Sequence, residues 1–327
     1  MRLLVTGGAG YIGSHVVRHL RADGHAVTVY DNLSTGHAWA VGDATLVEGD
    51  LADTAHLEQV FAAAEAEGGF DGVLHFAAHI VVPESVADPL KYYANNTRNT
   101  LNLLQACVRA GVRSFVFSST AAVYGIPATE RVTEDAPLQP INPYGASKMM
   151  SERMLTDVAA SSDLRYVILR YFNVAGADPG GRTGQATPDA THLVKVACQA
   201  ATGQRDGVTV FGRDYRTRDG TCERDYIHVE DLAAAHVRAL EHLQAGGQSQ
   251  ILNCGYGRGY SVLEVLEAVK RASRGDFPVR YGARRDGDPP ALMADAARIR
   301  EVLGWRPVYA DLDLIVQHAL AWERRPH

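Results

Sequence analysis

A glycine-rich turn lies between the first apolar run of the chain and its first helical stretch. The run Arg2–Thr6 is followed directly by Gly7-Gly8-Ala9-Gly10-Tyr11-Ile12-Gly13, and helical spacing continues through Ser14–Arg21. Glycines allow a tight turn and close approach of a ligand, while the helix behind them offers free N–H groups and the positive end of its dipole. This order predicts a Rossmann-type unit that binds a pyrophosphate, although a glycine-rich loop alone can also be a plain turn.

The rest of the first half alternates short β-branched runs with amphipathic segments. The expected strands are Arg2–Thr6, Ala26–Tyr30, Gly72–Phe76, Phe115–Ser118 and Tyr166–Arg170. Because these runs are almost continuously apolar, helices should cover both faces of their sheet. The pattern predicts an α/β fold with a Rossmann-type doubly wound parallel sheet.

The composition changes after Asn173, and the 327 residues are enough for a second, smaller unit. We expect residues 1–172 to form the nucleotide-binding Rossmann domain, with segments near 226–254 returning to it, and residues 173–327 to form mainly a smaller C-terminal substrate-binding domain. Ligands of open α/β sheets bind at the carboxyl ends of the strands, so the cleft between the two is the expected site. Further expected elements are helices near His192–Gly203, Val229–Leu243, Ser261–Ala272 and Ala296–Leu303, and a strand at Gln250–Cys254.

Charge and cysteine content exclude several classes of protein. The formal net charge is −6 and basic residues form no run longer than a pair, so nucleic acid is not an expected partner. No apolar stretch approaches the roughly 20 residues that span a bilayer, and no signal peptide is recognised, so we expect no membrane partner and a cytoplasmic location. The four cysteines lie far apart without CxxC spacing, which indicates neither disulfides nor a metal site.

An acidic residue follows the second expected strand. Asp31 lies about twenty residues beyond the glycines, where a carboxylate would accept hydrogen bonds from the adenosine ribose. It would repel a 2′-phosphate, so the sequence favours NAD over NADP. Asp50 follows a third apolar run and could reach the adenine, although a surface Asp after any strand would look the same.

A phenol and an ammonium lie four residues apart in Tyr144-Gly145-Ala146-Ser147-Lys148, on one face if the segment is helical. A phenol normally loses its proton near pH 10, so a base at pH 7 needs about 4 kcal/mol of stabilisation of the phenolate. The Lys148 ammonium and a nicotinamide ring could supply it. Thr120 ends a strand in Ser118-Ser119-Thr120 and could relay a proton between a substrate oxygen and Tyr144.

Taken together, the motifs resemble a known family. Gly7–Gly13, Asp31, Tyr144–Lys148 and Arg170-Tyr171-Phe172-Asn173 resemble the extended short-chain dehydrogenase/reductase family. The motifs that are similar to UDP-glucose 4-epimerases within that family are His75-Phe76-Ala77-Ala78, Tyr92-Tyr93-Ala94-Asn95-Asn96, Arg224–Asp231 and Arg285-Asp286-Gly287-Asp288. The similarity extends over almost the whole chain.

This resemblance implies the site residues. Those implied to bind NAD are Gly7, Gly10, Tyr11, Ile12, Gly13, Asp31, Asn32, Asp50, Leu51, Phe76, Ala77, Ala78, Asn95, Tyr144, Lys148 and Phe172. Those implied to bind a UDP-sugar are Thr120, Asn173, Leu193, Phe211, Arg224, Arg285 and Asp288. The two arginines would bind the diphosphate, and Asp288 would accept hydrogen bonds from ribose hydroxyls.

The implied reaction is reversible epimerisation at carbon 4 of a UDP-hexose, UDP-galactose or UDP-glucose, through a 4-keto intermediate with tightly bound NAD+. Tyr144, Lys148 and Thr120 would be the catalytic residues. The protein would be an NAD-dependent isomerase of carbohydrate, and specifically galactose, metabolism. Relatives commonly dimerise through helices of the nucleotide domain, so a homodimer is expected.

Three other functions fit parts of the pattern. A 4,6-dehydratase or decarboxylase of the same superfamily needs acidic groups directly after the Thr or Ser, whereas Ala121 and Ala122 follow Thr120. A non-catalytic NAD-binding protein would typically lack the Tyr/Lys pair. An ordinary dehydrogenase would exchange its cofactor during turnover.

Three positions depart from relatives or bear on the choice of sugar, which the sequence leaves open. Ile80 stands where many relatives have a Lys that touches the pyrophosphate, and His192 stands where they can have Asn. Leu292 stands where relatives restricted to unmodified hexoses can have Tyr. Because Leu is shorter, we expect UDP-glucose and UDP-galactose as main substrates, with slower turnover of UDP-N-acetylglucosamine.

Overall fold

The computed structural model describes residues 1–187, 189–285 and 288–325 and divides the chain into two units. Unit 1 consists of Met1–Tyr124, Leu138–Arg170 and Ala233–Leu252. Unit 2 consists of Gly125–Pro137, Tyr171–Leu232 and the segment that begins at Asn253. Asp286 and Gly287 of the fourth epimerase-like motif lie outside the described residues.

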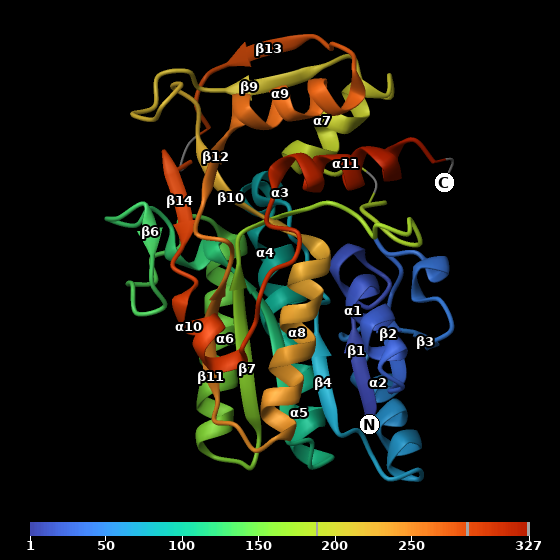
Figure 1. Ribbon diagram of the computed structural model, residues 1–327. Helices are drawn as coiled ribbons and strands as arrows, with labels where there is room; N and C mark the ends of the chain where they lie inside the picture. Colours follow the sequence, from blue (N-terminus) through green and yellow to red (C-terminus); the bar gives the residue numbers. More distant parts are fainter. Residues whose placement is uncertain (188, 286–287, 326–327) are drawn as a thin grey trace. The chain divides into compact units, whose positions relative to one another are not determined.

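Most elements of unit 1 come from the first half of the chain (Figure 1). In chain order they are β1 (Arg2–Thr6), α1 (Tyr11–Ala22), β2 (Ala26–Asp31), η1 (Ala38–Val41), β3 (Thr45–Glu48), α2 (Thr54–Glu65), β4 (Gly72–His75), α3 (Val82–Ala87), α4 (Pro89–Tyr92), η2 (Tyr93–Arg98), α5 (Asn99–Arg109), β5 (Ser114–Thr120), η3 (Ala121–Tyr124), α6 (Pro143–Ala160) and β7 (Arg165–Tyr171), followed later by α8 (Val229–Gln244) and β11 (Gln250–Cys254).

A seven-stranded sheet organises unit 1, with the order β11-β7-β5-β4-β1-β2-β3. Strand β1 pairs in parallel with β2 on one side and β4 on the other, and the pairs β2–β3 and β4–β5 are also parallel. The order reverses beside β1, so the carboxyl ends of β1 and β4 lie at a topological switch point where such sheets bind ligands. The predicted doubly wound α/β fold is therefore confirmed.

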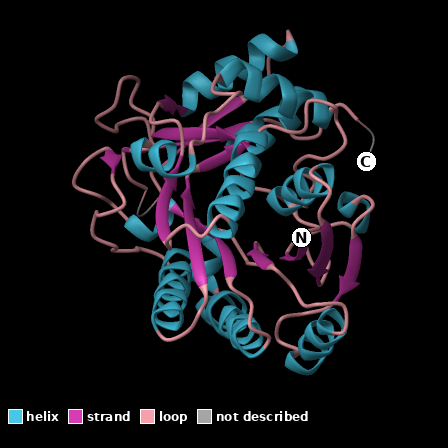
Figure 2. Cartoon of the chain, turned by 60° about the horizontal axis from the view of Figure 1, so that its bottom comes forward, coloured by secondary structure: helices cyan, strands magenta, loops and turns pink. Residues whose placement is uncertain are grey.

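Helices cover both faces of this sheet (Figures 1 and 2). On one face, side chains of α2, α5 and α6, including Leu57, Leu103 and Leu155, form a buried cluster with Leu4 and Phe115 of the strands. On the other face, α8 approaches β4 so closely that a Cβ at Gly72 would lie 3.0 Å from the side chain of Leu240. Strands buried on both faces explain the almost continuous apolar runs in the sequence.

Unit 2 contains shorter strands and a helical layer. Its elements are β6 (Arg131–Val132), β8 (Asn173–Ala175), α7 (Leu193–Ala201), β9 (Val208–Phe211), β10 (Glu223–His228), β12 (Gly259–Ser261), α9 (Val262–Ser273), β13 (Val279–Gly282), β14 (Ala291–Ala294), α10 (Ala297–Leu303) and α11 (Leu312–Glu323). Strand β10 lies between β12 and β14 and also pairs with β8, while β9 and β13 form a separate pair. Helices α7, α9 and α11 pack together over one buried cluster.

The expected elements are present, and their ends differ from the expected ones by at most three residues. Helix α11 and the wide-turn helix η2 were not expected from the sequence. All four cysteines are free and buried. Across the ranges that the structure describes, none of the helices is both long enough and apolar enough to cross a bilayer.

Candidate active site

The glycine turn between β1 and α1 has the geometry of a pyrophosphate cradle. Gly7 has φ of +72°, and a Cβ there would overlap the amide nitrogen of Ala77. A Cβ at Gly13 would overlap the carbonyl oxygen of Gly7. Gly10 caps α1 without a side-chain hydrogen bond, and no acidic residue lies in the first turn. Amides of Tyr11 and Ile12 can therefore face an anion, and the residues fit the phosphates of NAD.

Asp31 and Asp50 follow neighbouring strands of the sheet. Asp31 is 8% exposed and accepts hydrogen bonds from the amides of Ala9 and Leu33, both at 2.9 Å. Burial raises its pKa, and those two hydrogen bonds oppose the shift. A carboxylate has about four acceptor positions, so Asp31 retains capacity for ribose hydroxyls. The carboxylate of Asp50 accepts from the side-chain amide of Asn32 at 2.8 Å.

The turn after β4 approaches the glycine turn. The amides of Phe76 and Ala77 both donate to the carbonyl oxygen of Thr6, at 2.8 and 3.1 Å. Ala78 continues this turn. The side chain of Leu51, by contrast, is buried in the core, so any contact with a ligand would come from its main chain.

Asn96 holds this turn against α6, a role that the sequence analysis missed. Its side-chain amide bonds both the N–H and the C=O of His79, each at 2.9 Å, and also donates to the hydroxyl of Ser147 at 3.0 Å. Its neighbour Asn95, the predicted cofactor residue, donates to Asn96 at 3.0 Å. Both asparagines belong to η2, a π-helical turn of a kind often found at functional sites.

Tyr144, Lys148 and Thr120 all belong to unit 1. Asn142 caps α6 by accepting from Gly145 at 2.8 Å, which places Tyr144 in the first turn and Lys148 one turn later. The Lys148 ammonium donates to the carbonyl oxygen of Ser118 at 2.9 Å, two residues before Thr120 at the end of β5. Tyr144, Lys148 and Thr120 are 7%, 3% and 8% exposed, so the predicted catalytic side chains are shielded from water.

Burial lowers the pKa of Lys148 to about 7, and the carboxylate of Glu152 opposes this shift. The ammonium also lies 4.8 Å from the ring centroid of Phe117. His75 at the end of β4 is neutral at physiological pH, because burial and the charge of Lys148 lower its pKa to about 3. The Lys148 side chain therefore titrates close to neutrality, and its ammonium is the form present at lower pH.

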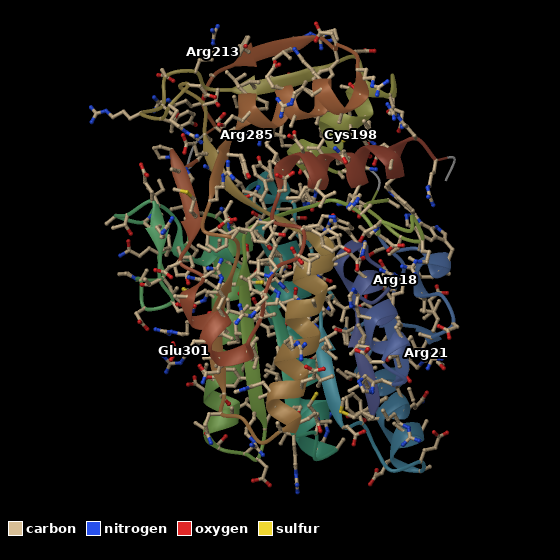
Figure 3. All side chains as sticks on the ribbon, in the orientation of Figure 1. Arg18, Arg21, Cys198, Arg213, Arg285 and Glu301 are labelled. Atoms are coloured by element: carbon tan, nitrogen blue, oxygen red, sulfur yellow. The ribbon has the colours of Figure 1, made fainter. Side chains whose placement is uncertain are left out.

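In unit 2, Arg224 and Asp288 are brought together. The guanidinium of Arg224 on β10 donates to the Asp288 carboxylate at 3.1 Å, and the Arg224 side chain is 13% exposed. Arg285, labelled in Figure 3, lies over the ring of Phe211 at the end of β9, with 4.0 Å between guanidinium carbon and ring centroid. These residues form an arginine-rich aromatic surface that suits a nucleotide diphosphate.

The remaining predicted residues of unit 2 lie at the ends of its elements. Phe172 is 8% exposed and precedes β8, whose first residue, Asn173, is exposed and pairs with Tyr226 of β10. Leu193 is the first residue of α7, behind His192, which contacts Gln185 at 3.2 Å.

Comparison with known proteins agrees with the motifs. Residues 3–255 match the NAD dependent epimerase/dehydratase family. This chain belongs to that family. Over 324 residues it is 58% identical to a UDP-glucose 4-epimerase from Azospirillum brasilense, covering 99% of this chain and 92% of the relative. The resemblance drawn from the motifs is confirmed.

Solved structures of family members share the fold over their full length. A UDP-glucose 4-epimerase from Brucella ovis in complex with NAD superposes with a TM-score of 0.94 at 48% identity, covering 98% of this chain and 97% of that one. A UDP-Glc/GlcNAc 4-epimerase from Campylobacter jejuni superposes with a TM-score of 0.86 at 48% identity, covering 99% of both chains.

Proposed function

We propose that this chain interconverts UDP-galactose and UDP-glucose by reversible epimerisation at carbon 4, with NAD+ as its cofactor. Tyr144, Lys148 and Thr120 are the catalytic residues, and the residues implied above to bind NAD and the UDP-sugar have those roles. The observation that carries the proposal is the arrangement of Tyr144 and Lys148 along α6, with Lys148 bonded to the strand end that carries Thr120. The glycine turn belongs to the same unit. Relatives named UDP-glucose 4-epimerase match the whole chain.

In the proposed reaction, Tyr144 accepts the proton of the 4-hydroxyl, directly or through Thr120, and later returns it. The Lys148 ammonium stabilises the phenolate, and the dry surroundings of both side chains strengthen that interaction. NAD+, which the glycine turn and Asp31 would hold, would supply the acceptor for the hydride of carbon 4 and the donor that returns it to the opposite face of the sugar. Directly after Thr120 come Ala121 and Ala122 in η3, so no acid is available there for elimination.

We assign nucleotide binding to residues 1–172 with the returning segments, and UDP-sugar binding mainly to residues 173–327. The 4-keto sugar has to present its other face, so the uridine diphosphate should be held firmly and the sugar loosely. Arg224, Arg285 and Asp288 are suited to holding the uridine diphosphate. Arg224 pairs with Asp288, whose amide bonds the carbonyl oxygen of Arg285, and the guanidinium of Arg285 lies over the ring of Phe211.

The cofactor can be identified directly. Because the Asp31 carboxylate disfavours a 2′-phosphate and the reaction regenerates NAD+, heat-denatured purified protein should release NAD and no NADP. The native protein should convert UDP-galactose to UDP-glucose without added cofactor. Chromatography of the released nucleotide and a coupled UDP-glucose assay make both measurements. Release of NADP would contradict the proposal, and activity that requires added NAD would favour an ordinary dehydrogenase.

Leu292 is expected to influence the choice of sugar. It lies on β14 in register with Arg224 on β10, so both side chains stand on the same face of the sheet, and it is 8% exposed. Pocket volume usually changes discrimination by roughly 10- to 200-fold in kcat/KM. Leu292→Tyr should therefore reduce turnover of UDP-N-acetylglucosamine relative to UDP-galactose by a factor in that range. An unchanged ratio of the two kcat/KM values would show that Leu292 does not limit the pocket.

The proposal includes a homodimer in the cytoplasm. Helices α3, α4, α5 and α6 pack together and expose large apolar side chains, namely Val86, Leu90, Leu101, Val108 and Met150. Contact with a second copy would remove this surface from water. The free, buried cysteines suit a reducing compartment.

A further inference from the structure

On the helix that carries Tyr144 and Lys148, a buried ion pair begins one helical turn beyond Lys148. Glu152 and Arg170 are each 3% exposed, and Arg170 donates to both carboxylate oxygens at 2.6 to 3.2 Å. Nothing in the proposed reaction uses either side chain directly. Buried charges are costly, so this pair needs an explanation beyond solubility or surface stability.

Contacts of the pair enclose the strand end that carries Thr120. Glu152 accepts from the hydroxyl of Ser119 at 2.5 Å, and Arg170 donates to the hydroxyl of Tyr124 at 3.0 Å. Ser119 directly precedes Thr120, and Tyr124 ends the short helix that follows it. The pair therefore joins α6, which also carries Tyr144, to β7 and to residues of β5 and η3 on either side of Thr120.

The same pair places charge near Lys148. Residues 144, 148 and 152 recur every four residues on one face of α6, so the Glu152 carboxylate lies close enough to favour the Lys148 ammonium. Arg170 partly cancels that negative charge. Of the other titratable groups around this face, His75 is neutral, and Tyr92, edge-on to Tyr144, has a pKa raised by burial and by Glu84. Tyr124 and Tyr144 also lie on the packed elements, as does Tyr166 of β7, whose pKa is raised by burial and by the Glu152 carboxylate.

We propose that Glu152 and Arg170 are positioning residues: together they hold the end of β5, and with it Thr120, against α6, and they place one negative and one positive charge one helical turn from Lys148. This inference rests on the proposed function, because that function gives Lys148 its role.

The effect of the two charges on the pKa of Lys148 can be measured without following the reaction. The chain contains only four lysines, Lys91, Lys148, Lys195 and Lys270. NMR titration of isotopically labelled lysine resolves them, with Lys148→Arg for assignment. Glu152→Gln removes an anion and should lower the pKa of Lys148, whereas Arg170→Met leaves that anion uncompensated and should raise it. Opposite shifts would show that the charges of Glu152 and Arg170 both act on Lys148, whereas a pair that acts only through packing would leave the pKa of Lys148 unchanged.

Two further variants serve as controls of the charge effect. Arg170→Lys keeps the cation and should leave the pKa of Lys148 unchanged. If Arg170→Met does not fold, the comparison of Arg170→Lys with Glu152→Gln tests whether the charges of the pair act on Lys148. Arg153→Gln removes one partner of the exposed Arg153–Asp157 pair on the same helix and should have no effect. Equal titrations in wild type and Glu152→Gln, or shifts in one direction for both charge variants, would overturn the inference.

The positioning part needs a variant that keeps both charges. Ser119→Ala removes the hydroxyl that ties β5 to Glu152, and it should lower kcat about 10-fold or more while KM for UDP-galactose changes less than about twofold. A kcat within twofold of wild type would refute the positioning role. If wild-type protein does not epimerise UDP-galactose, the proposed function fails. The lysine titration would still show whether Glu152 and Arg170 act on Lys148, because it needs no substrate.

Discussion

Tyr144→Phe is expected to reduce epimerisation of UDP-galactose by roughly 10²- to 10⁴-fold, the range typical of the loss of a general base. The substitution removes the hydroxyl and keeps the ring, which packs edge-on against Tyr92 with 6.5 Å between centroids. The fold and the nucleotide contacts of unit 2 should therefore be retained. Loss of activity should appear in kcat, while calorimetric titration with UDP-galactose should give a dissociation constant near that of wild type.

Tyr166→Phe provides the matched control. Tyr166 is a partly buried tyrosine of β7 in the same unit, outside the predicted site. Its variant should retain activity within about twofold, because surface or half-buried hydroxyls without a catalytic role contribute little. If Tyr144→Phe also remains within a few-fold of wild type, another group is the base.

Gly13→Ala should deprive the protein of its cofactor. A Cβ at this position would overlap the Gly7 carbonyl oxygen and lie 2.8 Å from the Cα of Gly8, both of which are backbone atoms that no side-chain rotation can move away. Relief of the overlap has to shift the turn and the amides at the start of α1. NAD carried through purification should fall at least about tenfold per chain, because the displaced amides can no longer bind the pyrophosphate. Activity without added NAD should fall in proportion.

The matched glycine control is Gly275→Ala. A Cβ there would meet only the Ser273 hydroxyl oxygen at 3.8 Å, an ordinary contact. Its NAD content should equal that of wild type, measured by absorbance and chromatography after denaturation. A Gly13→Ala protein that retains a full complement of NAD would show that the turn does not hold the pyrophosphate.

Much of the fold could be predicted from sequence because its signals are local. Strand β1 was predicted at Arg2–Thr6, the bounds observed, since a fully buried strand is a continuous apolar run ended by glycines. The spacing of Tyr144 and Lys148 also determined that they share one face of a helix, because helix geometry depends only on neighbouring residues. The family followed from motifs of the same local kind.

Residues whose hydrogen-bond partners are distant in the chain were not predicted from local sequence patterns. Asn96 was part of a quoted motif, yet its bond to Ser147 spans 51 residues and appears only when η2 packs against α6. Glu152 continues the four-residue spacing of α6, a signal that could have been used, but its partner Arg170 lies on a strand 18 residues later.

The sequence by itself determined the fold class, the glycine turn and the helical face that carries Tyr144 and Lys148, since each depends on the order of side chains within a few residues. Only the tertiary structure decided which carboxylates are already engaged, as Asp31 is with two amides, and how strongly Lys148 is desolvated. Burial and hydrogen bonding depend on what surrounds a group in space. For Lys148 those surroundings come from β4, β5, α6 and β7, which no local pattern can bring together.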